Sequence, residues 1–239
     1  MSGMKSVLGA IAVTIGLFTG PAVHAQQAPV VVELFTSQGC SSCPPADKLF
    51  RKLATRDDVI ALALHVDYWD YIGWKDVFAD PRFTKRQKTY AVTAGRRSVY
   101  TPQMIINGQQ DVVGTRAMEV ADLIMHNVQQ VPPVQLALAR AEDGGIEIAA
   151  EWTLPQSPRP MVVQLVHFMP EQTVHITRGE NAGETLPYTN IVNNWQMIGE
   201  WDGAAPLRMR IEDDGAQPLA VLIQIKGQGP IVGAAKLVP

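Results

Sequence analysis

The sequence predicts an α/β domain followed by an all-β, sandwich-like C-terminal domain. Three observations support this: an apolar strand–turn–helix–strand pattern near the start, a short hairpin and helix around residue 110, and repeated short apolar runs after residue 131. The chain has 239 residues, 46% of them hydrophobic, which suffices for one large domain or two ordinary ones. We therefore expect the two domains at residues 26–131 and 132–239.

Residues 1–25 have the composition of a secretory signal peptide. Lys5 is their only charged residue, an apolar run follows, and the small residues Val23 and Ala25 fit a cleavage site. The apolar run is shorter than the roughly 20 residues that a membrane span needs. We therefore expect cleavage after Ala25, a periplasmic or secreted product, and no membrane span in the mature protein.

The α/β pattern begins with residues 29–35, PVVVELF, a continuous β-branched run typical of strands buried on both faces of a parallel sheet. The turn TSQGCSSC follows, and then apolar residues at helical spacing predict a helix that starts within residues 40–43. A Pro-Pro pair directly after the turn fits this start, because a first helical turn tolerates proline. Residues 59–67, VIALALHVD, predict a second buried strand.

The following segments complete the predicted order of elements. Residues 68–99 are aromatic and turn-rich and predict an irregular, helical insert. Residues 104–106 and 111–113 predict two short strands joined by an Asn-Gly turn, and residues 115–128 predict a helix. After a Val-Pro-Pro hinge, runs such as GGIEIAAEW and LAVLIQIK, separated by turn residues, predict several short strands.

The only two cysteines, Cys40 and Cys43, lie three positions apart at the predicted helix start. This spacing brings the sulfurs close in a helical turn. A helix N-terminus favours negative charge and so lowers a thiol pKa, which populates the reactive thiolate. We expect Cys40, nearer the helix end, to attack a partner and Cys43 to resolve the mixed disulfide.

The strand VVVELF, the motif CSSCP and a later Tyr-Thr-Pro that enters a strand together resemble the thioredoxin family over residues 29–130. The resemblance implies a thioredoxin-like fold for the α/β domain and a cis-proline at Pro102, preceded by Thr101, that faces the cysteines and helps a partner to dock. The Ser41-Ser42 dipeptide differs from those of the best-known members, so the direction of electron flow stays open. ELFTSQGCSSCPPAD and VYTPQMIINGQQDVVG also resemble a narrower family of exported bacterial proteins known as a domain of unknown function.

Other polar and aromatic residues are candidates for the rim of this site. One group follows the second predicted strand, because the carboxyl ends of parallel strands often border sites. Another group lies in a polar, turn-forming stretch of the second domain that could form a loop over the cysteines. Together with the two serines, the candidates are Ser41, Ser42, His65, Asp67, Trp69, Arg178 and Glu180. For the aromatic residues after the strand, the alternative role is packing of the insert onto the core, and for His65 it is a hydrogen-bonded position in the core. For the second group the alternative is an ordinary long loop.

The sequence thus predicts an exported thiol–disulfide oxidoreductase that uses Cys40 and Cys43 on a protein or small-thiol partner, without a cofactor or resident metal. A non-catalytic binding module with a structural disulfide is one alternative. A copper(I)-handling protein with His65 as a third ligand is another. The formal net charge is −3 and the sequence has no basic stripe, so we expect no nucleic-acid partner.

Overall fold

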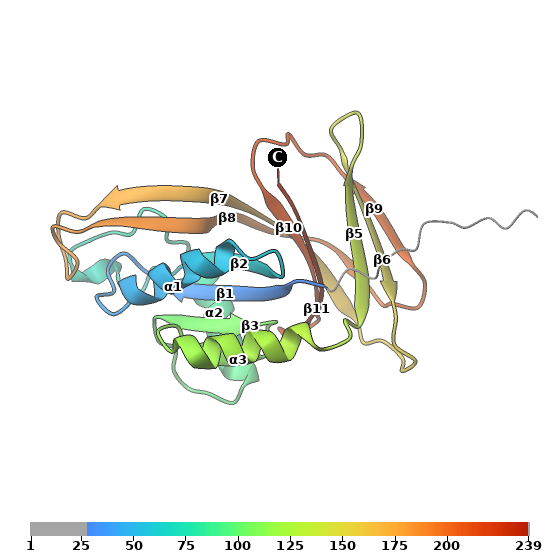
Figure 1. Ribbon diagram of the computed structural model, residues 1–239, viewed down its shortest axis with the longest axis horizontal. Helices are drawn as coiled ribbons and strands as arrows, with labels where there is room; N and C mark the ends of the chain where they lie inside the picture. Colours follow the sequence, from blue (N-terminus) through green and yellow to red (C-terminus); the bar gives the residue numbers. More distant parts are fainter. Residues whose placement is uncertain (1–27, 239) are drawn as a thin grey trace, which may run out of the picture.

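The computed structural model describes residues 28–238 and begins with a strand–helix–strand unit (Figure 1). Strand β1 (Val30–Thr36) pairs in parallel with β2 (Val59–His65), and helix α1 (Pro44–Ala54) connects them. Every residue of both strands is buried, as expected for apolar strands in a sheet that is covered on both faces. The predicted order of strand, helix and strand is confirmed. The predicted signal peptide, residues 1–25, lies outside the described residues.

The insert, the hairpin and the following helix also occur in the predicted order. In chain order they are η1, a short 3-10 helix (Asp70–Ile72), α2 (Pro81–Thr93), β3 (Gln103–Ile106), β4 (Gln110–Val113) and α3 (Ala117–Val128). Strand β3 pairs antiparallel with both β1 and β4. The β3–β4 turn is left-handed at Asn107 (φ 47°) and Gly108 (φ 68°), which explains the Asn-Gly pair.

In the described residues, seven strands follow α3. They are β5 (Val134–Arg140), β6 (Ile146–Trp152), β7 (Met161–His175), β8 (Thr185–Trp201), β9 (Leu207–Ile211), β10 (Leu219–Ile225) and β11 (Ile231–Leu237). Strands β7 and β8 have 15 and 17 residues and form one long hairpin, which replaces several of the shorter predicted strands. This hairpin runs along β2 towards the end of the molecule where α1 begins (Figure 1).

The predicted fold class, an α/β thioredoxin-like domain followed by a separate all-β sandwich-like domain, is wrong. Strands from both halves form one eight-stranded mixed sheet in the order β11-β10-β7-β8-β2-β1-β3-β4, and β5, β6 and β9 form a second sheet. The halves join where β8 pairs in parallel with β2, at Ile191 and Ala63. An apolar strand such as β2 leaves unpaired backbone groups at an open edge, and β8 covers part of this edge. The predicted boundary between residues 131 and 132 stays a prediction.

Different elements cover the two faces of the central strands. Helices α1 and α3 pack on one face through a cluster that includes Phe50, Ile124 and Val32. Helix α2 packs on the other face, where Phe83 joins a cluster that also contains residues of β7 and β10. The three-stranded sheet packs against β7, β10 and β11. The turn between β1 and α1 therefore lies at the end of a core that is packed on both sides.

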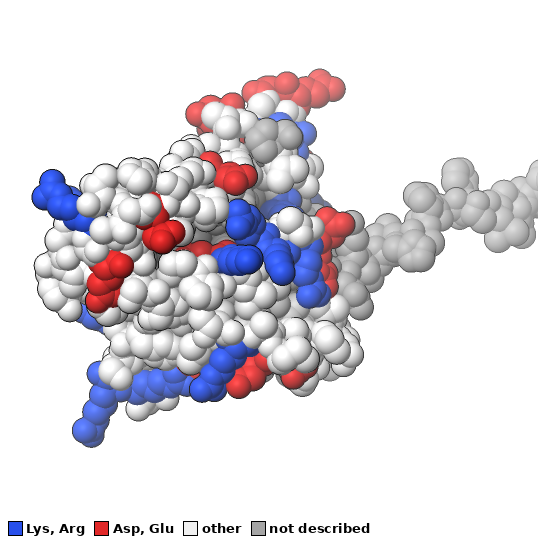
Figure 2. All heavy atoms as spheres, turned by 60° about the vertical axis from the view of Figure 1, so that its left-hand side comes forward, with Lys and Arg blue, Asp and Glu red and all other residues white. Residues whose placement is uncertain are grey.

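The surface around the β1–α1 turn has no single charge sign. This end of the molecule comes forward in Figure 2, where basic and acidic side chains are interspersed with uncharged ones. Among residues 28–238, no helix has the length and apolar character needed to cross a membrane.

Candidate redox site

The candidate site is built on the turn between β1 and α1. Cys40 and Cys43 form a disulfide with Cα atoms 5.4 Å apart. Helix α1 begins at Pro44, and Cys43 is its N-cap, so the helix starts just after the predicted segment. Pro44 and Pro45 carry no N–H group. This helix end therefore offers fewer free amides to a thiolate than an ordinary helix start.

Thr101 lies directly beside Cys40, as the resemblance implies. Its hydroxyl donates a hydrogen bond to the Cys40 Sγ at 3.2 Å, and the Trp69 Nε1 donates to the Thr101 hydroxyl oxygen at 2.8 Å. The peptide bond between Thr101 and Pro102 is cis. Three predicted site residues from separate segments, Cys40, Trp69 and Thr101, thus form one hydrogen-bonded chain.

The disulfide is covered from solvent. Cys40 is 1% exposed and Cys43 is 0% exposed, whereas Ser41 and Ser42 between them are exposed. Part of the cover comes from the segment that carries Trp69. A Cβ atom added to Gly39 would lie 3.2 Å from the Trp69 Cβ, so the turn and this segment are in close contact. A partner sulfur cannot reach Cys40 unless some of this cover moves.

The loop between β7 and β8 forms a second part of the site. The Asn181 Nδ2 donates to the backbone oxygens of Gln38 at 2.8 Å and of Cys40 at 3.1 Å. The backbone N–H of Ser41 donates to the Glu180 Oε2 at 3.3 Å. Of the two residues predicted here, Glu180 therefore contacts the cysteine turn, while Arg178 is an exposed residue of the same loop. Asn181 is not among the predicted site residues.

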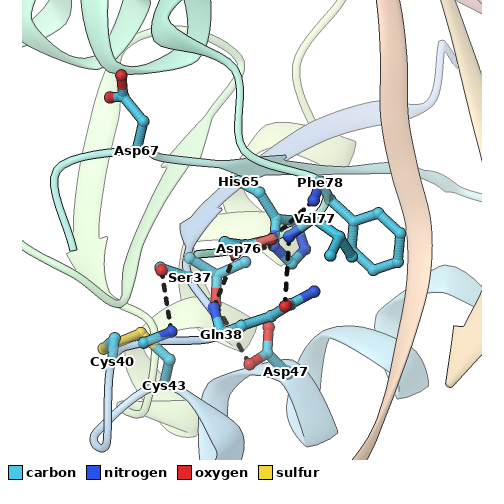
Figure 3. Close-up of polar contacts among 12 residues, drawn as sticks. Ser37, Gln38, Cys40, Cys43, Asp47, His65, Asp67, Asp76, Val77 and Phe78 are labelled. Carbon is cyan, nitrogen blue, oxygen red and sulfur yellow. Dashed lines mark hydrogen bonds and ion pairs between the residues drawn. A yellow bond between two sulfur atoms is a disulfide. The ribbon is translucent and has the colours of Figure 1, made fainter. Parts of the chain in front are cut away.

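A buried polar cluster lies behind the disulfide (Figure 3). His65 Nδ1 and Asp76 Oδ2 are 2.7 Å apart, and both side chains are 0% exposed. The same Asp76 oxygen accepts a hydrogen bond from the Gln38 backbone N–H at 2.8 Å. The Thr36 hydroxyl donates to the Asp47 Oδ2 at 3.2 Å. The cluster connects β1, α1, the end of β2 and the insert, and it places His65 in the interior rather than at a rim.

The two carboxyl groups of this cluster have opposite pKa shifts. Burial raises the pKa of Asp47 to about 7, although the His65 charge and the Thr36 hydroxyl act against this rise. Burial also acts to raise the pKa of Asp76, but the His65 charge and the hydrogen bonds from His65, Gln38 and Phe78 hold it below its ordinary value. Asp47 can therefore bind or release a proton near neutral pH, while Asp76 stays ionised.

Sequence reasoning missed both carboxyl groups for a physical reason. An acidic residue in the first turn of a helix is favoured by the helix dipole, so Asp47 looked like an ordinary helix-start residue. Asp76 reaches Gln38 only because the insert folds back onto the β1–α1 turn. In both cases the missing information was tertiary: the burial of the helix start for Asp47 and the position of the insert for Asp76.

Asp67 lies apart from this cluster and from the cysteines (Figure 3). It accepts a hydrogen bond from the Thr84 hydroxyl and lines a surface concavity together with Tyr68 and Lys88. The structure therefore does not bring Asp67 to the disulfide. In the part of the chain that the structure describes, no group of three or more His, Cys, Asp or Glu side chains is placed to hold a metal ion.

The fold and site together define a mixed-sheet protein with a covered disulfide at a helix start, beside a Thr-Pro peptide. Residues 31–224 match the family described as "Protein of unknown function (DUF1223)", and the chain belongs to this family. The matched region contains both cysteines, Thr101 and the β7–β8 loop. No curated protein matches the chain.

Two solved structures are similar to this chain. One is the crystal structure of protein AGR_C_4864 from Agrobacterium tumefaciens, which is 35% identical, with 89% of this chain and 96% of that chain covered and a TM-score of 0.76. The other is HBP35 of Porphyromonas gingivalis, which is 13% identical, with 88% and 75% of the two chains covered and a TM-score of 0.64. At this low identity, the second similarity concerns the fold alone.

Proposed function

We propose that this protein is an exported thiol–disulfide oxidoreductase that acts through Cys40 and Cys43 on a protein or small-thiol partner. The observation that carries the proposal is the Thr101 hydroxyl, which donates to the Cys40 Sγ at 3.2 Å at the end of a buried sheet. A donor aimed at one of the two sulfurs makes the pair asymmetric, because it stabilises negative charge on that sulfur. The resemblance of residues 29–130 to thioredoxins gives further support.

In the proposed exchange, a partner thiolate attacks the Cys40 Sγ. A bond forms between the partner sulfur and Cys40, and the Cys40–Cys43 bond breaks with its electron pair left on Cys43. A second partner thiolate, or a second thiol of the same partner, then attacks the partner sulfur. This step releases an oxidised partner disulfide and a reduced Cys40–Cys43 pair. The same steps in reverse order oxidise the cysteine pair and reduce a partner disulfide.

One observation favours a second candidate, a structural disulfide in a binding module. Both cysteines are at most 1% exposed, and a disulfide that only fixes the start of α1 needs no access. The two candidates differ in reduction potential, because structural disulfides have values below roughly −300 mV. They differ also in the rate of thiol–disulfide exchange at Cys40, which only the oxidoreductase requires to be faster than at an ordinary protein disulfide.

The test measures thiol–disulfide exchange between the reduced protein and a model peptide disulfide. Wild-type protein is expected to exchange faster than the uncatalysed thiol control, and Cys40→Ala is expected to lose this activity. Cys43→Ala is expected to stop at a mixed disulfide between Cys40 and the peptide, which mass spectrometry detects. Ser157→Ala, an exposed serine between β6 and β7 and outside the cysteine turn, is the matched control and should keep full activity. Equal rates for wild-type and Cys40→Ala protein would refute the proposal.

A further inference from the structure

The tip of the β7–β8 hairpin holds a carboxylate against the turn that contains both cysteines. Glu180 accepts a hydrogen bond from the Ser41 backbone N–H at 3.3 Å, and Ser41 directly follows Cys40. The next residue, Asn181, is 7% exposed and donates to the backbone oxygens of Gln38 and Cys40. Asn181 is thus a buried anchor that holds Glu180 against Ser41, the residue next to the proposed attacking Cys40.

The backbone amides around the disulfide are largely engaged. The Cys40 N–H donates to the Ser37 oxygen, the Cys43 N–H donates to the Cys40 oxygen, and the Ala46 N–H donates to the Cys43 oxygen. The first two residues of α1 are prolines and have no N–H to offer. The Ser41 amide, a donor close to Cys40, is directed to Glu180. A thiolate on Cys40 would therefore form one residue away from a backbone amide that already donates to the Glu180 carboxylate.

Charged and titratable groups lie on several elements that form or border this turn. Asp47 of α1, His65 of β2 and Asp76 of the insert belong to the buried cluster, and the β7–β8 hairpin tip carries Glu180 together with the exposed Glu184 and Arg178. Glu180 is the one whose side chain bonds the turn residue that follows Cys40. Glu184 is an exposed carboxylate on the same hairpin tip and is joined to Asn181 through its backbone N–H. It provides a matched control for a general effect of charge.

We propose that Glu180 tunes the redox balance of the cysteine pair, because its carboxylate disfavours the Cys40 thiolate and so shifts the couple towards the disulfide. In the reduction, two thiols of the reductant transfer two electrons to the Cys40–Cys43 disulfide. The products are the Cys40/Cys43 dithiol and the disulfide of the reductant. At a pH where Cys40 ionises, the reduced protein also releases a proton to solvent. A nearby negative charge opposes that ionisation and therefore makes the reduced pair a stronger electron donor. A role for this tuning in the cell rests on the proposed function, but the effect of Glu180 on the disulfide–dithiol equilibrium does not.

The experiment equilibrates the protein with mixtures of reduced and oxidised glutathione at pH 6 and pH 8 and measures the reduced fraction by thiol alkylation. Glu180→Gln is expected to increase the equilibrium constant for reduction at pH 8 by about two- to fivefold, the range for an exposed charge pair. For comparison, a tenfold change corresponds to about 30 mV. The effect should be smaller at pH 6, where less thiolate forms, and smaller in high salt. Glu184→Gln should leave the constant within about 1.5-fold of wild type, because among the described residues the exposed Glu184 carboxylate makes no hydrogen bond to the cysteine turn and solvent screens it.

A second readout uses the Cys43→Ala background, in which Cys40 is a free thiol. The pH dependence of its alkylation rate is expected to shift to lower pH when Glu180 is replaced by glutamine. No shift at pH 8 in the glutathione equilibrium, or an equal shift in Glu184→Gln, would overturn the inference. A shifted equilibrium together with peptide exchange no faster than the uncatalysed control would support Glu180 as the tuning residue. The same result would reject the oxidoreductase proposal, so the two failures are distinguishable.

Discussion

Two buried clusters of charged side chains lie on neighbouring strands of the same sheet, and they differ in how completely their hydrogen bonds are made. In the first, Glu33 of β1 bonds to Arg86 and Tyr90 of α2. In the second, His65 of β2 bonds to Asp76 behind the disulfide. Within residues 28–238, the buried side-chain atoms of Glu33, Arg86 and Tyr90 all have hydrogen-bond partners, whereas the His65 Nε2 has none.

The first cluster holds the two halves of the chain together. The Arg86 Nε donates to a Glu33 oxygen at 2.6 Å, and the Tyr90 hydroxyl donates to the other at 2.6 Å. The Arg86 guanidinium lies 4.0 Å from the ring centroid of Trp195 on β8, and Gln224 of β10 donates to the Tyr90 oxygen at 3.0 Å. A buried network with every partner in place fixes one arrangement of the elements that it joins. Its role is therefore structural.

The second cluster is incomplete. The Tyr188 hydroxyl and the Gln38 Nε2 also lack hydrogen-bond partners among the described residues, and the rings of His65 and Tyr188 have centroids 5.0 Å apart. The same cluster contains Asp47, whose pKa burial raises to about 7. Unsatisfied buried groups and a pKa shifted to near neutral pH are more typical of functional sites than of structural ion pairs. In the first cluster, burial instead raises the pKa of Tyr90 further from neutrality. The comparison thus separates a cluster that stabilises the fold from one that can change its protonation state.

Replacement of Arg86 with methionine is expected to have the largest effect. It leaves the Glu33 carboxylate buried without its partner, and breaking such a buried ion pair costs about 3–5 kcal/mol. The free energy of unfolding from urea denaturation measures the loss. Arg82→Met on the same helix is the control, because the Arg82 side chain is 57% exposed and its pair with Asp80 lies at the surface. If Arg86→Met were as stable as Arg82→Met, the structural role of the first cluster would be wrong.

Replacement of Asp47 with asparagine is expected to change how stability depends on pH. The folded-state pKa of about 7 lies above the ordinary value of 3.8. Between pH 3.8 and about pH 7, Asp47 is therefore protonated in the folded protein but ionised in the unfolded chain. The stability contributed by this proton is therefore present below about pH 4 and is lost as the pH rises through about 7. Since one pKa unit is worth about 1.4 kcal/mol, the loss is on the order of 2–4 kcal/mol.

The asparagine side chain has no such proton, so the stability of the Asp47→Asn variant relative to wild type should increase from pH 5 to pH 8. Urea denaturation of both proteins at the two pH values measures this difference. Asp122→Asn, a substitution on α3 away from the cluster, should show a constant difference from wild type. If the difference in the free energy of unfolding between Asp47→Asn and wild type were the same at pH 5 and pH 8, Asp47 would not titrate between these pH values.

The parts of the molecule that could be predicted from sequence depend on local signals. The buried run of β1, the helical spacing of α1 and the Asn-Gly turn at residues 107–108 each involve neighbouring residues, and each element was found. The pairing of β8 with β2 joins Ile191 to Ala63, and no local pattern specifies it. The fold class was wrong for this reason, although most of its elements were right.

In the candidate site, too, the residues with local signals could be predicted and those that depend on long-range contacts could not. Cys40 and Cys43 could be found from their spacing, and Thr101 and Pro102 from the resemblance. Glu180 could be suggested only as part of a polar loop, since its contact with Ser41 spans 139 positions. Asn181, whose amide bonds the backbone of Gln38 and Cys40, has no sequence signal that distinguishes it from an ordinary turn residue.

Two tyrosine-to-phenylalanine changes compare the clusters most directly and are expected to have the smallest effects. The Tyr90 hydroxyl donates to Glu33 and accepts from Arg86 at 2.8 Å, so Tyr90→Phe leaves buried charged groups with fewer partners and should cost about 1–3 kcal/mol. The Tyr188 hydroxyl has no hydrogen-bond partner in the part of the chain that the structure describes. Tyr188→Phe therefore removes a desolvated group at no cost in hydrogen bonds and should change stability by less than about 0.5 kcal/mol. Thermal and urea unfolding of both variants at one pH measures the contrast. Equal destabilisation by the two changes would show that the second cluster is as completely bonded in solution as the first, and the distinction between them would fail.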